Sequence, residues 1–186
     1  MTQLVYLGPE GTFTHQAALA LCPPGARLIA EDSLEAVLAA LETGRADYAV
    51  AAETSAAGPI AATCEALQSG RLHAAARHAI AVSFDLYRRP GDTEDLIGIY
   101  GHEKALSQVR AFVAANALKT RPVASNTAGL LQVRDAAEPG WGAAGPPGLG
   151  AHYELEVTAH ALEGPVRNET VFVLLRRPRP DQGIQP

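Results

Sequence analysis

The sequence predicts an α/β fold built around a largely parallel sheet. Three apolar runs, at residues 4–7, 27–30 and 48–52, are expected to be buried strands, and each of the first two is followed by a segment with the apolar spacing of a helix. Strands that alternate with helices in this way are joined by right-handed crossovers, and such crossovers connect parallel strands.

The opening of the chain has the pattern of a strand, a tight loop and a helix. Leu4 to Leu7 leads into two glycines and a proline, and helical spacing starts at Thr12 and continues through Phe13 and Ala17. Free backbone N–H groups at the start of a helix suit an anionic ligand. The simpler alternative is a turn that needs glycine only for its backbone angles.

The second helix is expected to begin with a capping box made by Asp32 and Glu35 and to end at Gly44. The third strand then leads directly into Glu53, Thr54 and Ser55. Ligands in open α/β sheets bind outside the carboxyl ends of strands, so these three side chains are placed to face one. The alternative is that Thr54 or Ser55 caps the next helix, with Pro59 in its first turn and Glu53 solvated.

The rest of the chain continues the alternation of strands and helices. Residues 72–87 alternate as one strand, long enough to leave one lobe and enter another. Further strands are expected at 96–100, 121–124 and 168–175, with a helix opening at 101–108 and another that runs from 127 to Ala136. The glycine-rich segment 140–150 lacks a Gly-Lys-Ser/Thr ending and contains two prolines, which excludes a phosphate-binding loop.

Composition and charge narrow the classes of function. The chain of 186 residues is 47% hydrophobic and 19% charged, as expected of a soluble globular protein. Its net charge of -5, with no basic stripe, argues against nucleic acid as a partner. No apolar run approaches the length of about 18 residues that a membrane span needs, and the absence of a secretory leader predicts a cytoplasmic location. Cys22 and Cys64 are expected to be reduced thiols without a metal.

Five motif runs resemble those of the prephenate dehydratase family, and they follow one another in the family's order. They are Gly-Pro-Glu-Gly-Thr-Phe at 8–13, Glu-Thr-Ser at 53–55, His-Glu-Lys-Ala-Leu at 102–106, the run around Thr127, and Asn-Glu-Thr-Val-Phe at 168–172. The resemblance implies two α/β lobes with mostly parallel or mixed sheets, similar to type II periplasmic binding proteins. The first lobe is expected to hold residues 1–78 and 160–186, and the second residues 79–159.

The resemblance also implies an activity, the conversion of prephenate to phenylpyruvate in phenylalanine biosynthesis. Thr170, Glu53 and His102 are the expected catalytic residues. The expected substrate-binding residues are Pro9, Thr12, Phe13, Thr54, Ser55, Lys104, Thr127, Asn168 and Phe172. No metal or cofactor is expected, and the family suggests a homodimer. Most members continue into a regulatory domain that senses phenylalanine, and this chain is expected to lack it.

Val171 is the main departure from the family, because arginine occupies that place in the motif Asn-x-Thr-Arg-Phe. Prephenate is a dianion, and a lost charge-assisted contact typically costs roughly 1.5 to 3 kcal/mol. Arg167 cannot be assumed to substitute, whereas Lys104, where the family has glutamine, is expected to restore a positive charge from the second lobe. The alternative for Lys104 is a solvated residue in a first helical turn.

The chemistry assigns different tasks to the three predicted catalytic residues. A threonine hydroxyl is a poor acid, so Thr170 is expected to hydrogen-bond the leaving hydroxyl of the substrate. Glu53 is a candidate proton source if burial raises its pKa, and His102 is another. Two alternatives to prephenate dehydration stay open: a non-catalytic two-lobed protein that binds a small acid, and dehydration of arogenate.

Overall fold

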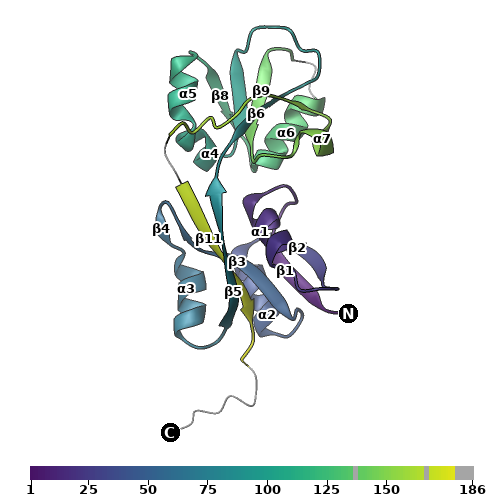
Figure 1. Cartoon of the computed structure of the whole chain (residues 1–186), viewed down its shortest axis with the longest axis vertical. Helices are drawn as coiled ribbons and strands as arrows, with labels where there is room; N and C mark the ends of the chain where they lie inside the picture. Colours follow the sequence, from purple (N-terminus) through teal and green to yellow (C-terminus); the bar gives the residue numbers. More distant parts are fainter. Residues whose placement is uncertain (136–137, 166–167, 179–186) are drawn as a thin grey trace. The chain divides into compact units, whose positions relative to one another are not determined.

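The computed structural model describes residues 1–135, 138–165 and 168–178 (Figure 1). The chain forms two compact units. Unit 1 comprises Met1–Ala81 and the segment that begins at Asn168, and unit 2 comprises Val82–Arg167. Each unit contains its own sheet and its own helices, so the predicted α/β class with two lobes is confirmed.

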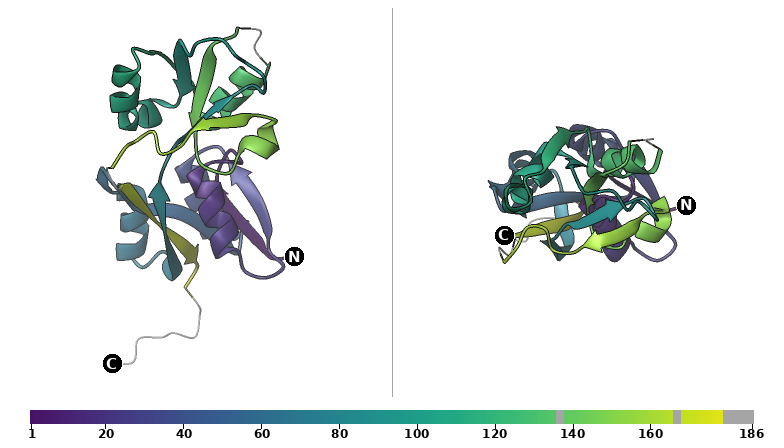
Figure 2. Two further views of the ribbon diagram at one scale, coloured as in Figure 1. Left: turned by 45° about the horizontal axis from the view of Figure 1, so that its top comes forward. Right: turned by 90° about the horizontal axis from the view of Figure 1, so that it is seen from above.

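Unit 1 contains, within its described residues, a six-stranded mixed sheet. Its elements are β1 (Gln3–Leu7), α1 (Phe13–Leu21), β2 (Arg27–Glu31), α2 (Leu34–Glu42), β3 (Tyr48–Ser55), β4 (Gly58–Pro59), α3 (Ala61–Gln68), β5 (His73–Val82) and β11 (Asn168–Arg176). The strand order is β2-β1-β3-β11-β5, with β4 paired to β3. β1 is parallel to both β2 and β3, and β11 is antiparallel to β3. The long strands β5 and β11 run side by side (Figure 2).

Helices pack on both faces of the unit 1 sheet. Successive residues of a strand point to opposite faces, and in β3 Ala49 and Ala51 belong to one core cluster while Val50 belongs to another. The first cluster takes its helical residues from α2 and α3, and the second takes them from α1. The centre of the sheet is therefore buried on both faces, and functional residues are expected at the ends of its strands.

Unit 2 contains a second mixed sheet, with the strand order β10-β6-β9-β7-β8. Its elements are β6 (Asp85–Arg88), β7 (Gly98–Gly101), α4 (Glu103–Gln108), α5 (Arg110–Ala115), β8 (Lys119–Pro122), α6 (Asn126–Asp135), β9 (Trp141–Gly145), α7 (Gly150–Tyr153) and β10 (Glu156–Ala159). β7 is parallel to β8 and to β9. A core with Tyr87, Leu130 and Trp141 joins this sheet to α6.

From the sequence, the chain is expected to pass from one lobe to the other after residues 78 and 159. In the structure, the boundaries between the two units follow residues 81 and 167. Two hydrogen bonds hold residues 160–165 in unit 2: the N–H of Leu162 donates to the carbonyl of Phe84 at 2.9 Å, and the N–H of Phe84 donates to Oε2 of Glu163 at 2.9 Å. The same bonds explain why the predicted single strand over 72–87 is wrong. Phe84 bonds to this segment instead of a ladder partner, so the strand is divided into β5 and β6.

Several local predictions need correction. The cap of α2 is Ser33, whose Oγ accepts from the N–H of Ala36 at 3.1 Å, and not Asp32. The helix predicted from residue 101 onward is two short helices, because Val109 leaves helical geometry at φ -93° and ψ 12°. The glycine-rich segment is β9 followed by α7, which agrees with the rejection of a phosphate loop. Ala136, the predicted end of the sixth helix, and Arg167 lie outside the described residues.

Candidate functional site

Three of the motif runs meet at one edge of the unit 1 sheet. β1 and β3 are parallel neighbours, so the segments that follow them lie at the same end of the sheet. β11 is antiparallel to β3, so its first residues lie at that end too, and Val171 stands opposite Thr54. The structure thus brings together, within unit 1, the predicted residues of the loop 9–13, of the run 53–55 and of the run 168–172.

Thr12 ties the opening loop to α1. Its Oγ1 accepts from the N–H of His15 at 3.2 Å and donates to the carbonyl of Pro9 at 3.0 Å. The N–H of Gly11 donates to Nδ1 of His15 at 3.1 Å. The amides of Gly11 and His15, two of those that could bind an anion, are therefore used within the protein, which favours the simpler interpretation of a turn stabilised by its own groups. A binding role for Pro9 and Thr12 stays a prediction.

His15 was not singled out from the sequence, although it organises this loop. Its imidazole stacks on the ring of Tyr6, with centroids 5.2 Å apart and planes at 26°. Tyr6 is only 1% exposed, and burial raises the pKa of its phenol. The hydrogen bond between Gly11 and His15 joins residues four positions apart, and this spacing is the sequence feature that indicates it.

Glu53 is the extra residue of a β-bulge. Val171 and Phe172 are consecutive in β11, but their partners in β3 are Thr54 and Ala52, which have Glu53 between them. A bulge of this kind takes a side chain out of the regular alternation and gives it a new direction. Such bulges are frequent beside functional sites.

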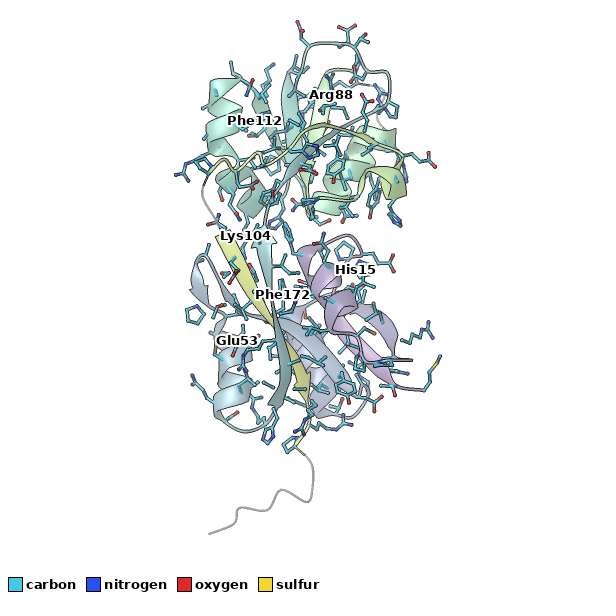
Figure 3. All side chains as sticks on the ribbon, in the orientation of Figure 1. His15, Glu53, Arg88, Lys104, Phe112 and Phe172 are labelled. Atoms are coloured by element: carbon cyan, nitrogen blue, oxygen red, sulfur yellow. The ribbon has the colours of Figure 1, made fainter. Side chains whose placement is uncertain are left out.

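Figure 3 labels the side chain of Glu53 in unit 1. Its carboxylate is bound by Arg77 of β5, the strand on the other side of β11. Nε of Arg77 donates to Oε2 at 2.6 Å, and Nη2 donates to Oε1 at 2.9 Å. The side chain of Glu53 is 17% exposed and that of Arg77 is 53% exposed. The sequence offered one clue to Arg77, a charged residue in an otherwise alanine-rich strand.

Hydrogen bonds from Arg77 lower the pKa of Glu53, against an opposite effect of burial. The condition under which Glu53 was expected to supply a proton, a pKa raised by burial, is therefore not met. Glu53 is an ionised carboxylate at neutral pH, and its immediate contact is with a guanidinium.

Thr54 and Ser55 lie in a hairpin and not at the start of a helix. β4 turns back to pair Gly58 with Ser55 and Pro59 with Thr54. Oγ of Ser55 accepts from the N–H of Ala57 at 3.3 Å and donates to the carbonyl of Gly58 at 3.4 Å, and Gly58 has a φ of +104°. The alternative in which Thr54 or Ser55 caps a helix, with Pro59 in its first turn, is wrong because α3 begins only at Ala61.

The predicted residues of β11 differ in burial. Asn168 and Thr170 are half-buried at the start of the strand, next to the hairpin. Phe172 is 2% exposed and belongs to the core cluster of α1, against which Phe13 also packs. Phe172 therefore has a packing role in this structure, while Asn168 and Thr170 remain partly accessible.

In unit 2, His102 caps α4. The Nδ1 atom of its imidazole accepts a hydrogen bond from the backbone N–H of Lys104 at 3.3 Å. The backbone N–H of His102 donates to Oδ1 of Asn126 at 2.9 Å. An Nδ1 that accepts leaves the proton of a neutral imidazole on Nε2, which is the atom left for an outside partner. Asn126 was not predicted, but it follows β8, the parallel neighbour of β7, so the two segments after these strands meet.

Lys104 and Thr127 have unlike environments. Lys104 is exposed, and its ammonium forms no ion pair with any residue in 1–135, 138–165 or 168–178.

Thr127 is buried in α6, and the N-cap of this helix is formed by Ser125, whose Oγ accepts from the N–H of Ala128 at 3.0 Å. Thr127 therefore lies inside the helix and not at its N-cap, and its binding role stays a prediction.

No cluster of three His, Cys, Asp or Glu residues that would hold a metal is found in the described part of the chain. Cys22 and Cys64 are free thiols. The described residues also include no helix with the length and apolarity to cross a bilayer. A polar surface hollow in unit 2, lined by residues 89–94 and Pro139, contains none of the predicted site residues.

The family model of prephenate dehydratases matches residues 4–180. The chain belongs to the prephenate dehydratase family. The prephenate dehydratase of Amycolatopsis methanolica is 33% identical over 180 residues, and the match covers 96% of this chain and 59% of that protein. The chain therefore spans about three fifths of the length of this relative.

Solved structures of the prephenate dehydratase family share the fold. The enzyme from Staphylococcus aureus has a TM-score of 0.81 at 23% identity, over 96% of this chain and 68% of that one. The enzyme from Arthrobacter aurescens, solved in complex with L-Phe, has a TM-score of 0.79 at 28% identity, over 100% of this chain and 61% of that one. An ABC transporter protein from Parabacteroides distasonis has a TM-score of 0.51 at 12% identity, over 96% of this chain and 66% of that one, which shows likeness of fold alone.

Proposed function

We propose that the chain catalyses the decarboxylating dehydration of prephenate to phenylpyruvate in L-phenylalanine biosynthesis. The observation that carries the proposal is the meeting of three family motifs, with Thr12, Glu53 and Thr170, at one edge of the unit 1 sheet. Membership of the family supports the same reaction.

The reaction removes two groups from one ring. The bond from the ring to its carboxylate breaks and releases carbon dioxide, and the electron pair of that bond shifts into the ring. The 4-hydroxyl leaves and takes up one proton to become water, so the prephenate dianion and a proton give the phenylpyruvate anion, carbon dioxide and water. Aromatisation drives this change, and the enzyme has to position the dianion and assist the leaving hydroxyl.

Thr170 is the residue that we assign to the leaving hydroxyl. Its side chain is half-buried at the start of β11, and a hydroxyl can donate a hydrogen bond to the departing oxygen. Glu53 is ionised beside Arg77, so it is unsuited to proton donation and suited to orienting its partner. His102, with Nε2 left for an outside partner, is the remaining candidate acid.

The proposal is tested by supplying fresh prephenate at neutral pH and measuring phenylpyruvate and carbon dioxide. We expect both products in equal amounts, at a rate well above that of prephenate alone in the same buffer. A parallel assay with arogenate separates the two substrates, and a preference for arogenate would contradict the assignment. Equal rates with and without the protein would contradict it also.

A second candidate is a non-catalytic protein that binds a small acid, and the replacement of the family's arginine by Val171 favours it. Binding of prephenate without turnover is the result expected of such a protein.

We also propose that the active form is a cytoplasmic homodimer, as the family resemblance suggests. Light scattering coupled to size-exclusion chromatography tests the dimer through its mass, and a monomer that retains full activity would contradict it. Cell fractionation tests the location.

A further inference from the structure

We propose that Arg77 is a substrate-binding residue, whose guanidinium is held in place by Glu53 and binds the carboxylate of the 2-oxo acid side chain of prephenate. This inference rests on the proposed function for the identity of the ligand. It assigns to Arg77 the positive charge that a dianionic substrate needs and that Val171 does not provide.

The geometry leaves one end of the guanidinium available. Glu53 occupies Nε and Nη2 in a parallel pair of hydrogen bonds, and Nη1 makes no hydrogen bond to the described residues. The five N–H donors of an arginine lie in one plane and in fixed directions, so anchoring one edge fixes the direction of the other. Arg77 is thus oriented before a ligand arrives, which reduces the entropy that binding costs.

Two parallel hydrogen bonds distinguish this pair from the other ion pairs among the described residues of unit 1, since Arg45 and Glu31, which are 60% and 19% exposed, share a single bond of 3.2 Å. In the Glu53–Arg77 pair the side chain of Glu53 is 17% exposed and that of Arg77 is 53% exposed, and two bonds join them. Arg71 instead meets Glu42 at 2.9 Å and Glu65 at 3.6 Å, and Glu65 is 77% exposed. An acceptor that holds two N–H groups of an arginine, while the arginine stays 53% exposed, suits the presentation of that arginine to a ligand.

The position of the pair fits a ligand at the predicted site. Glu53 is the bulged residue beside Thr54 and opposite β11, at the sheet edge that also carries Thr170. β5 contributes Arg77 from the far side of β11, so the pair spans the strand of the proposed catalytic threonine. Through Glu53, Arg77 is therefore bound to the part of β3 that faces Val171 and Phe172, the residues that follow Thr170 in β11.

The chemistry selects which of the two substrate carboxylates Arg77 binds. An arginine on the ring carboxylate would stabilise the charge that must be lost as carbon dioxide, and so would stabilise the ground state over the transition state. An arginine on the side-chain carboxylate binds substrate and transition state alike. This choice predicts that phenylpyruvate, which keeps that carboxylate, binds to Arg77 too.

The test compares Arg77→Gln, Arg77→Lys and the matched control Arg71→Gln, which removes an equally charged and similarly exposed arginine from the same unit. Two measurements are made on each: KM and kcat with prephenate, and the dissociation constant of phenylpyruvate by calorimetry. Circular dichroism and thermal unfolding verify that each variant is folded.

We expect Arg77→Gln to weaken phenylpyruvate binding and to raise KM by about 10- to 100-fold, the loss typical of a charge-assisted hydrogen bond, with a smaller change in kcat. Arg77→Lys keeps the charge but not the planar fork, so its loss should be smaller. Arg71→Gln should behave as the parent.

The outcomes separate this inference from the proposed function. If the parent turns over prephenate and Arg77→Gln has the same KM and the same affinity for phenylpyruvate, the inference is overturned and the proposed function stands. A parent without turnover that binds phenylpyruvate in an Arg77-dependent way overturns the function and supports the inference. A parent that neither turns over prephenate nor binds phenylpyruvate overturns both.

Discussion

Glu53 and Arg77 are joined by two parallel hydrogen bonds of 2.6 and 2.9 Å that reach from β3 to β5 across the intervening β11. The pair keeps the carboxylate ionised and fixes the direction of the guanidinium. Glu53, which the chemistry of the reaction made a candidate proton source, is therefore the residue that anchors Arg77.

The pair predicts a pH dependence of stability. The folded pKa of Glu53 lies below that of the unfolded chain, so its contribution to the free energy of unfolding is complete above the ordinary glutamate pKa of about 4.3 and is lost as the pH falls through the depressed value. Arg77→Gln removes the main cause of this shift, and at neutral pH we expect it to cost roughly 1 kcal/mol, since Arg77 is half exposed.

Urea denaturation of the parent and of Arg77→Gln between pH 7 and about pH 3 checks this prediction. The difference between the two proteins should be constant down to about pH 4.3 and should shrink below it. A difference that grows on acidification would contradict the direction of the shift.

The cap made by His102 predicts a second effect on stability. Replacement of a capping side chain by alanine typically costs about 1 kcal/mol, so His102→Ala should lower the free energy of unfolding of unit 2 by about that amount. His102→Asn keeps an acceptor at the cap and should cost less. Denaturant titrations of both variants measure the two values, and equal losses would show that the bond to Lys104 N–H contributes nothing.

Lys104 gives a prediction that depends on salt. Its ammonium is exposed and forms no ion pair within the described residues, so any attraction to an anionic substrate is screened as ionic strength rises. We expect Lys104→Gln to raise KM by less than 10-fold at low salt, with kcat unchanged, and to differ little from the parent near 0.5 M salt. A variant that binds and turns over prephenate like the parent at low salt would remove Lys104 from the proposed site.

Much of the fold could be predicted because its elements are specified locally. The glycine loop followed by a helix, the end of α2 next to Gly44 and the strand β11 all have short-range patterns, and each is found in the structure. The motif runs at 8–13, 53–55 and 168–172 also identified the edge of unit 1 where they meet.

The features that were missed depend on residues far apart in the chain. The bulge at Glu53 exists only because β3 pairs with β11, and the bond to Arg77 requires that β5 lie on the other side of β11. The spacing of nearby residues indicates neither the pairing of β3 with β11 nor the position of β5 beside β11. The division of the long strand at Phe84 likewise results from bonds to Leu162 and Glu163.

The most direct test of the central claim is phenylpyruvate formation from fresh prephenate by the parent, Thr170→Val and Thr170→Ser. Valine keeps the shape of threonine without its hydroxyl, and serine keeps the hydroxyl, so the pair isolates the group that we assign to the leaving oxygen. We predict a parent rate far above the spontaneous one, a loss of at least about 100-fold in kcat for Thr170→Val, and most of the activity in Thr170→Ser. A parent no faster than the spontaneous reaction, or a Thr170→Val variant as fast as the parent, would contradict the account.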